Sequence, residues 1–143
     1  MSMRKVAMAV ALSGALLVAG AGAAQADYWT SSISNWAAPK DTRDFKDTNP
    51  SSGSNTTKWT LTRCNGAMYI DPSTVTFRLY EVIAVLPDKN LGAKAIACNA
   101  TGSGSASWTS VPSGKTYHFT YTAMNGDTGN YDRLNVGSVR ADY

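Results

Sequence analysis

Alternating apolar and polar residues along Thr74–Leu86 predict a long central strand. Val75, Phe77 and Leu79 occupy every second position, which is the period of a strand with one buried face. The same alternation gives Glu81 the inward position, where an unpaired carboxylate would be costly, so we expect a bulge or a second covering layer near Tyr80–Val82. The continuous apolar end of the run is typical of a strand covered on both faces. We therefore expect one central strand over the whole run.

The same period recurs in shorter segments. Lys58–Cys64 places Trp59 and Leu61 on one face, and Thr116–Met124 places its aromatic residues on one face and His118 on the other. Turn-forming Gly, Pro, Asn and Asp separate such segments at intervals of about 8–12 residues. The sequence therefore predicts an all-β fold, an antiparallel β-sandwich of roughly seven or eight short strands with Ig-like or jelly-roll topology.

The end of the Lys58–Cys64 segment leaves two alternatives open. Asn65-Gly66 follows it directly and predicts a two-residue hairpin turn, with Ala67–Ile70 returning antiparallel. In this register Cys64 lies on the polar face, opposite Trp59. Either the sulfur of Cys64 lies at the surface, or a bulge changes the phase before the turn.

The first 26 residues have the three parts of a secretory signal peptide. Arg4 and Lys5 form a basic start, Val6–Ala24 carries no charge, and Ala24-Gln25-Ala26 is a cleavage pattern before Asp27. An uncleaved membrane anchor is the alternative, because about 19 uncharged residues could just span a bilayer. The Ala-rich, weakly apolar composition favours cleavage and is similar to bacterial signals. We expect residues 27–143 to form one secreted, extracellular domain.

Loss of the signal peptide changes the charge of the chain. The remaining 117 residues hold 11 basic and 10 acidic side chains, so the formal net charge falls from +3 to about +1. A nearly neutral chain offers no electrostatic basis for binding nucleic acid or an anionic membrane. We expect a monomer with neither partner.

Cys64 and Cys98 are the two cysteines of the chain. An even pair in an exported protein predicts a disulfide. Two free thiols are one alternative, and a redox or metal-binding pair is another. Their spacing matches neither a CxxC motif nor a zinc pattern, and His118 is the only histidine.

No arrangement of residues demands catalysis. His118 lies on the Thr-rich face of its strand and is expected at the surface or in an interface, and Glu81 is the only Glu, which leaves no evident pair of catalytic carboxylates. We therefore expect a protein that is not an enzyme.

Asn125–Asp132 is rich in side-chain oxygen atoms. Asp127, Asn130 and Asp132 could ligate a hard cation such as calcium. Their spacing departs from the EF-hand pattern, and the same residue types are usual in turns. We expect no cofactor, with calcium as the alternative.

The chain contains four Trp and seven Tyr. Trp59 and Trp108 lie on alternating segments and are expected in the core. Trp29 and Trp36 are expected to be exposed, where they could stack on sugar rings or form a protein contact.

These features favour a non-catalytic module that binds an extracellular or cell-envelope polymer, such as a carbohydrate, or a protein. An inhibitor or toxin-like protein is the first alternative, acting through a loop at Asn49–Thr56 or Asn125–Asp132. A small secreted hydrolase is the second.

Overall fold

The computed structural model describes residues 27–48, 54–66, 72–129 and 133–143. These residues form nine strands and no helix, and so include no helix that could cross a membrane. The strands are β1 (Tyr28–Trp36), β2 (Lys40–Asp41), β3 (Phe45–Lys46), β4 (Ser54–Gly66), β5 (Thr74–Glu81), β6 (Lys89–Ala97), β7 (Ser103–Pro112), β8 (Thr116–Met124) and β9 (Leu134–Asp142).

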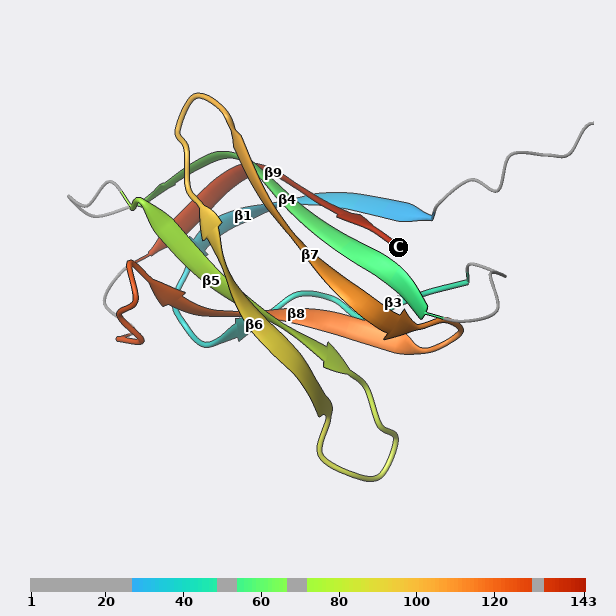
Figure 1. The fold of residues 1–143 in the computed structure, drawn as a ribbon. Helices are drawn as coiled ribbons and strands as arrows, with labels where there is room; N and C mark the ends of the chain where they lie inside the picture. The colour runs from blue at the N-terminus through green and yellow to red at the C-terminus, as the bar shows by residue number, and fades with distance from the viewer. Residues whose placement is uncertain (1–26, 49–53, 67–71, 130–132) are drawn as a thin grey trace, which may run out of the picture.

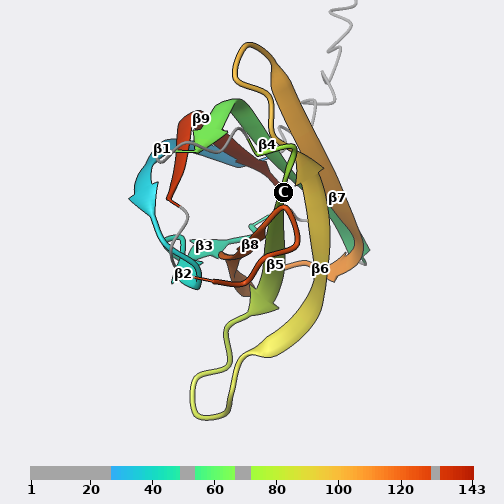
Figure 2. The ribbon, with the colours of Figure 1, turned by 90° about the vertical axis from the view of Figure 1, so that its left-hand side faces the viewer.

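Two antiparallel sheets face each other, as Figures 1 and 2 show. One sheet has the order β1-β9-β4-β7, and the other has the order β2-β8-β5-β6 with β3 also paired to β8. The prediction of an antiparallel β-sandwich is confirmed. The strand number is higher than expected because β2 and β3, each of two residues, pair separately with β8. Among the described strands only β5 and β6 are hydrogen-bonded neighbours that follow each other in the chain.

The core lies between the sheets and is built from alternate residues of β4, β5 and β8. Trp59 packs on Phe119 and Phe77, with ring centroids 4.5 and 5.6 Å apart. Trp59 and Trp108 are buried, as predicted. Each such aromatic side chain contributes about 1.5–3 kcal/mol through the apolar area that it removes from water.

The two sheets are close at one edge and open at the other. At the close edge, a Cβ atom on Gly104 of β7 would lie 2.0 Å from the carbonyl oxygen of Ala97 at the end of β6. Only glycine permits this approach. At the other edge, β1 of one sheet faces β2 and β3 of the other sheet (Figure 2). The chain passes from one sheet to the other between β1 and β2.

A disulfide joins the two sheets. Cys64 of β4 is bonded to Cys98, which directly follows β6, so the predicted pairing is confirmed. Cys64 is buried because Arg63 adopts a positive φ of 55° and changes the phase of the strand after the buried Leu61. The phase change, and not a surface position for the Cys64 sulfur, is therefore the correct alternative.

The predicted hairpin turn at Asn65-Gly66 is wrong. Both residues continue β4 and pair with Asn135 and Leu134 of β9. The expected return strand, Ala67–Ile70, lies outside the described residues. Asn-Gly favours a tight turn only where the next segment pairs with the same strand, and here β4 is followed by a strand of the other sheet.

The central strand is shorter than predicted. β5 ends at Glu81, and Val82–Leu86 leads into the loop before β6, so the expectation of a strand covered on both faces is wrong there. The Ile83 N–H donates to the carboxylate of Asp88 at 3.0 Å, which closes this loop. Val85 and Leu86 are 91% and 67% exposed. The loop projects from one end of the molecule in Figures 1 and 2.

Glu81 lies inward, as the alternation predicted, and is 7% exposed. It is flanked on the neighbouring strands by Lys89 and Tyr117. Burial raises the pKa of the Tyr117 hydroxyl well above its ordinary value, and the carboxylates of Glu81 and Asp47 add to the rise. The Tyr117 hydroxyl also donates to the carbonyl of Pro112, so its neutral form is stabilised.

Candidate functional site

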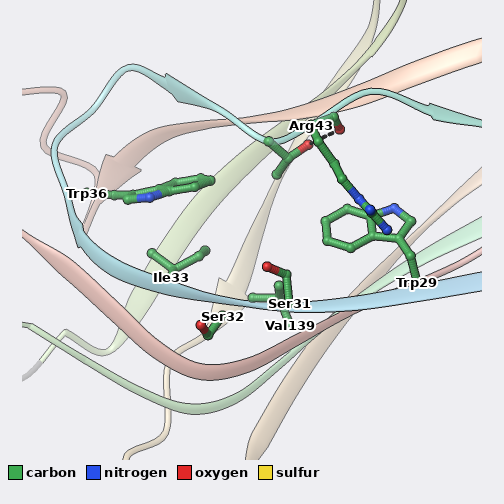
Figure 3. A pocket seen from close by; sticks show the side chains of 8 residues that line it. Trp29, Ser31, Ser32, Ile33, Trp36, Arg43 and Val139 are labelled. Carbon is green, nitrogen blue, oxygen red and sulfur yellow. Dashed lines mark hydrogen bonds between the residues drawn. The ribbon is translucent and has the colours of Figure 1, made fainter.

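A pocket of about 100 Å³ lies at the open edge between the sheets. Most of its wall comes from β1, and the segment between β2 and β3 and one residue of β9 complete it. Figure 3 shows Trp36 and Trp29 at opposite ends, with Ile33 between them and Arg43 reaching across the Trp29 ring. The lining residues are Trp29, Ser31, Ser32, Ile33, Trp36, Thr42, Arg43 and Val139.

The irregular register of β1 brings both tryptophans to this pocket. In a regular strand, residues an odd number of positions apart face opposite ways, so Trp29 and Trp36 would not share a face. The pairing of β1 with β9 shifts between Ser31 and Ile33 and again between Ile33 and Trp36. Asn35 has a positive φ of 57° within the second shift. The second shift adds one residue to β1 relative to β9 and so returns Trp36 to the inner side, where it packs partly against the core.

The expectation that Trp29 is exposed is wrong. Its side chain is 6% exposed and packs on Trp59 and Phe45, with ring centroids 5.3 and 6.1 Å apart. The register of β1 against β9 directs it into the core. Its indole Nε1 is buried and has no hydrogen-bond partner among the described residues. Trp29 is therefore a wall of the pocket and also a core residue.

Trp36 is half-buried and borders two depressions. Besides the pocket shared with Trp29, it lines a wider depression of about 490 Å³, in which the charged residues are Lys40 and Arg133. Trp36 is thus the accessible aromatic ring of this region, in part agreement with the prediction that it is exposed.

Arg43 supplies the charge of the pocket. Its guanidinium carbon lies 4.7 Å from the centroid of a Trp29 ring, which is a cation–π contact. Within the described ranges no carboxylate forms an ion pair with Arg43. Burial raises the pKa of the nearby Tyr143 hydroxyl, the Asp27 carboxylate adds to the rise, and the Arg43 guanidinium opposes it.

The hydroxyl groups of the pocket differ in how they are used. The Thr42 hydroxyl accepts a hydrogen bond from the Phe119 N–H at 3.0 Å and donates one to the Arg43 carbonyl at 3.0 Å. Thr42 therefore holds the β2–β3 segment against β8. Ser31 and Ser32 are exposed residues of β1 that line the pocket, and Figure 3 shows the Ser31 side chain on the side of the strand that faces Arg43 and the Ser32 side chain on the other side.

A second cluster surrounds His118 on the outer face of the other sheet. His118 is 8% exposed, so the expectation of a surface histidine is wrong. Its ring stacks on Tyr80 at 5.4 Å, and carboxylate oxygens of Asp41, Asp44 and Asp88 lie 3.7–3.9 Å from its nitrogens. The Thr120 hydroxyl donates to Asp41 at 2.6 Å. These three acids come from segments outside β8 that cover its outer face. The alternation within β8 therefore could not predict that His118 is buried.

The calcium alternative is only partly covered by the structure. Asn130 and Asp132 lie outside the described residues. Asp127 pairs with Met124 in an isolated bridge, and its carboxylate accepts a hydrogen bond from the Gly129 N–H at 2.8 Å. In the part of the chain that is described, no group of three or more His, Cys, Asp or Glu residues is arranged to hold a metal ion.

Comparisons with protein families, curated proteins and solved structures find no match to this chain. Its function must therefore be inferred from the two clusters and the exposed loop.

Proposed function

We propose that the chain is an exported, non-catalytic module that binds an extracellular or cell-envelope polymer in the pocket between Trp29 and Trp36. The observation that carries this proposal is the convergence of the two tryptophans on one pocket. An aromatic wall with a few hydroxyls and one cation suits recognition by stacking and a small number of hydrogen bonds.

The size of the pocket restricts how the ligand binds. Pockets that enclose a whole small molecule measure about 300–1,000 Å³, whereas this one measures about 100 Å³. It fits one ring or side chain, with the rest of the ligand lying along the surface. This favours one unit of a carbohydrate chain over a free metabolite.

Export is part of the proposal and has a direct test. Removal of residues 1–26 would leave Asp27 as the first residue, immediately before β1. Mass spectrometry of the protein from culture medium should give an N-terminus at Asp27. Recovery of a chain that starts at Met1 in the membrane fraction would contradict cleavage and would support the uncleaved membrane anchor.

Binding is tested with polysaccharides of different backbones, presented as insoluble particles or on an array. Trp36→Ala should abolish retention of the bound polymer, because Trp36 is the accessible ring. Tyr28→Ala is the matched control, since Tyr28 is an exposed aromatic on the same strand that does not line the pocket. Equal retention of the two variants would contradict the assignment of the pocket.

A loop-presenting inhibitor is the second candidate, favoured by the exposed Val85 and Leu86. This loop differs from the two that the sequence suggested. Residues 54–56 of Asn49–Thr56 belong to β4, and residues 49–53 lie outside the described part. Inhibition of a secreted protease that is lost in Val85→Ser/Leu86→Ser and retained in Trp36→Ala would support the inhibitor.

A further inference from the structure

The cations around Trp36 point to the charge of the ligand. Arg43 lines the pocket on one side, and Lys40 and Arg133 line the wider depression that Trp36 also borders. Among the described residues, no Asp or Glu lines either depression. The charged side chains that the structure places around Trp36 are therefore all cations, although the mature chain as a whole carries about +1.

In the segment between β1 and β3, the acidic side chains and the Arg43 side chain point to different faces of the sheet. Asp41 and Asp44, which flank Arg43 in sequence, direct their carboxylates to His118 on the outer face of the sheet. Arg43 instead lies over Trp29 at the pocket. The mixed charges of the sequence Asp41–Asp44 are thus divided into an acidic cluster on one face and a single cation at the pocket.

Two groups at the Trp29 end of the pocket lack an acceptor within the described structure. The Arg43 guanidinium forms no ion pair there, and the buried Nε1–H of Trp29 has no hydrogen-bond partner. A guanidinium stacked on an aromatic ring keeps its in-plane N–H groups free for a carboxylate, which it binds through two parallel hydrogen bonds. A carboxylate is therefore the ligand group that this end of the pocket lacks.

We propose that the ligand is an acidic polysaccharide, and that the pocket takes a sugar ring bearing a carboxylate. Arg43 binds the carboxylate, Trp36 stacks on the apolar face of the ring, and Lys40 and Arg133 pair with acidic units further along the chain. This inference rests on the proposed binding function. An acidic polypeptide would satisfy the cations but would offer no ring to Trp36.

The test compares two forms of one polymer. Polygalacturonate and its fully methyl-esterified form share a backbone and differ in the charge of the carboxyl group. Isothermal titration calorimetry with the mature protein should show at least about tenfold tighter binding, per sugar unit, of the acid form, because hydrogen bonds between charged partners are the stronger ones. Poly-L-glutamate is the probe for carboxylates without sugar rings.

Variants assign the effect to residues. Arg43→Gln should weaken binding of polygalacturonate about 10–100-fold and binding of the ester by a much smaller factor, because the ester can accept only a neutral hydrogen bond. Arg43→Lys should restore only part of the loss, since lysine keeps the charge but not the planar fork. Lys94→Gln is the matched control, because Lys94 is an exposed cation on β6, at the opposite edge of the sheet from β2. Arg43 is exposed, so a melting curve like that of the wild type should confirm that Arg43→Gln is folded.

Each of the following results would overturn the inference. Equal affinity for the acid and the ester, or binding of a neutral polymer alone, would reject the acidic ligand. The proposed binding function would still stand if retention of the polymer depended on Trp36. Equal affinity for poly-L-glutamate would reject the sugar ring. An equal loss in Lys94→Gln and Arg43→Gln would indicate non-specific charge attraction. Absence of binding to polygalacturonate would reject the acidic sugar, and absence of binding to any polymer of the neutral and acidic panel would reject the binding function as well.

Discussion

The indole rings of Trp29 and Trp59 lie 5.3 Å apart between their centroids, with their planes inclined by 55°. This contact joins the first strand of the described domain to the centre of the core. Trp29→Ala should therefore reduce the free energy of unfolding by about 3–5 kcal/mol, as Trp59→Ala should. Trp36→Ala should have a smaller effect, because Trp36 is only half-buried. Urea denaturation of the three variants measures the difference.

Tyr28→Ala is the control for this comparison. Tyr28 is 57% exposed, and its ring contacts the Arg140 guanidinium at 4.0 Å. Its loss should change stability by less than about 1 kcal/mol. A Trp29→Ala variant as stable as Tyr28→Ala would contradict the core role of Trp29.

The disulfide prediction concerns the bond between Cys64 and Cys98, which are 34 residues apart. Replacing both with Ser should reduce stability by about 2–5 kcal/mol, because the bond restricts the unfolded chain. Non-reducing mass spectrometry should show the two cysteines in one linked peptide. Alkylation of both thiols without a reductant would show that the bond does not form.

Substitutions in the exposed loop before β6 should have little effect on stability, in contrast to those in the core and at the disulfide. Val85→Ser and Leu86→Ser should change the free energy of unfolding by less than about 0.5 kcal/mol, since surface substitutions away from packed groups have small effects. Leu79→Ala on β5 is the buried comparison and should reduce stability by about 2–5 kcal/mol. A loss on Val85→Ser that approaches that of Leu79→Ala would mean that the loop is covered.

Tyr117 predicts a loss of stability at alkaline pH. Its pKa in the folded protein is raised above the ordinary 10.0. The unfolded chain therefore releases this proton first, so the contribution to stability is complete below pH 10.0 and is lost as pH rises through the folded pKa. Tyr117→Phe should make the decline above about pH 10 shallower. Part of the decline should remain, because the pKa of Tyr143 is also raised.

The core was predictable because it follows from local alternation. Trp59 and Leu61, and likewise Val75, Phe77 and Leu79, are buried at the positions that a period of two assigns to them. The disulfide was predictable from the number of cysteines and the expected compartment. Both inferences need only residues that are close in sequence or few in number.

The errors concern residues whose environment depends on distant segments. The sequence shows that Trp29 and Val85 are apolar, but their coverage depends on whether another strand packs over them. Arg63 changes the phase of β4 through a backbone angle that no residue pattern near it demands. The pocket also depends on the contact between Arg43 and Trp29. The pairing of β2 and β3 with β8 positions Arg43 for this contact, and residues near Arg43 in sequence do not reveal that pairing.

The pairing of the first described strand with the last has a consequence for folding. β9 lies between β1 and β4, and the Tyr143 N–H donates to the Asp27 carbonyl at 2.9 Å. The sheet cannot join its two halves before residues 134–142 have been synthesised. Contacts so distant in sequence slow folding, because a long chain segment must be ordered before they form. A ribosome-bound chain that lacks β9 would leave the backbone edge of β1 without its partner strand, so this domain should reach its native state only after β9 has left the ribosome.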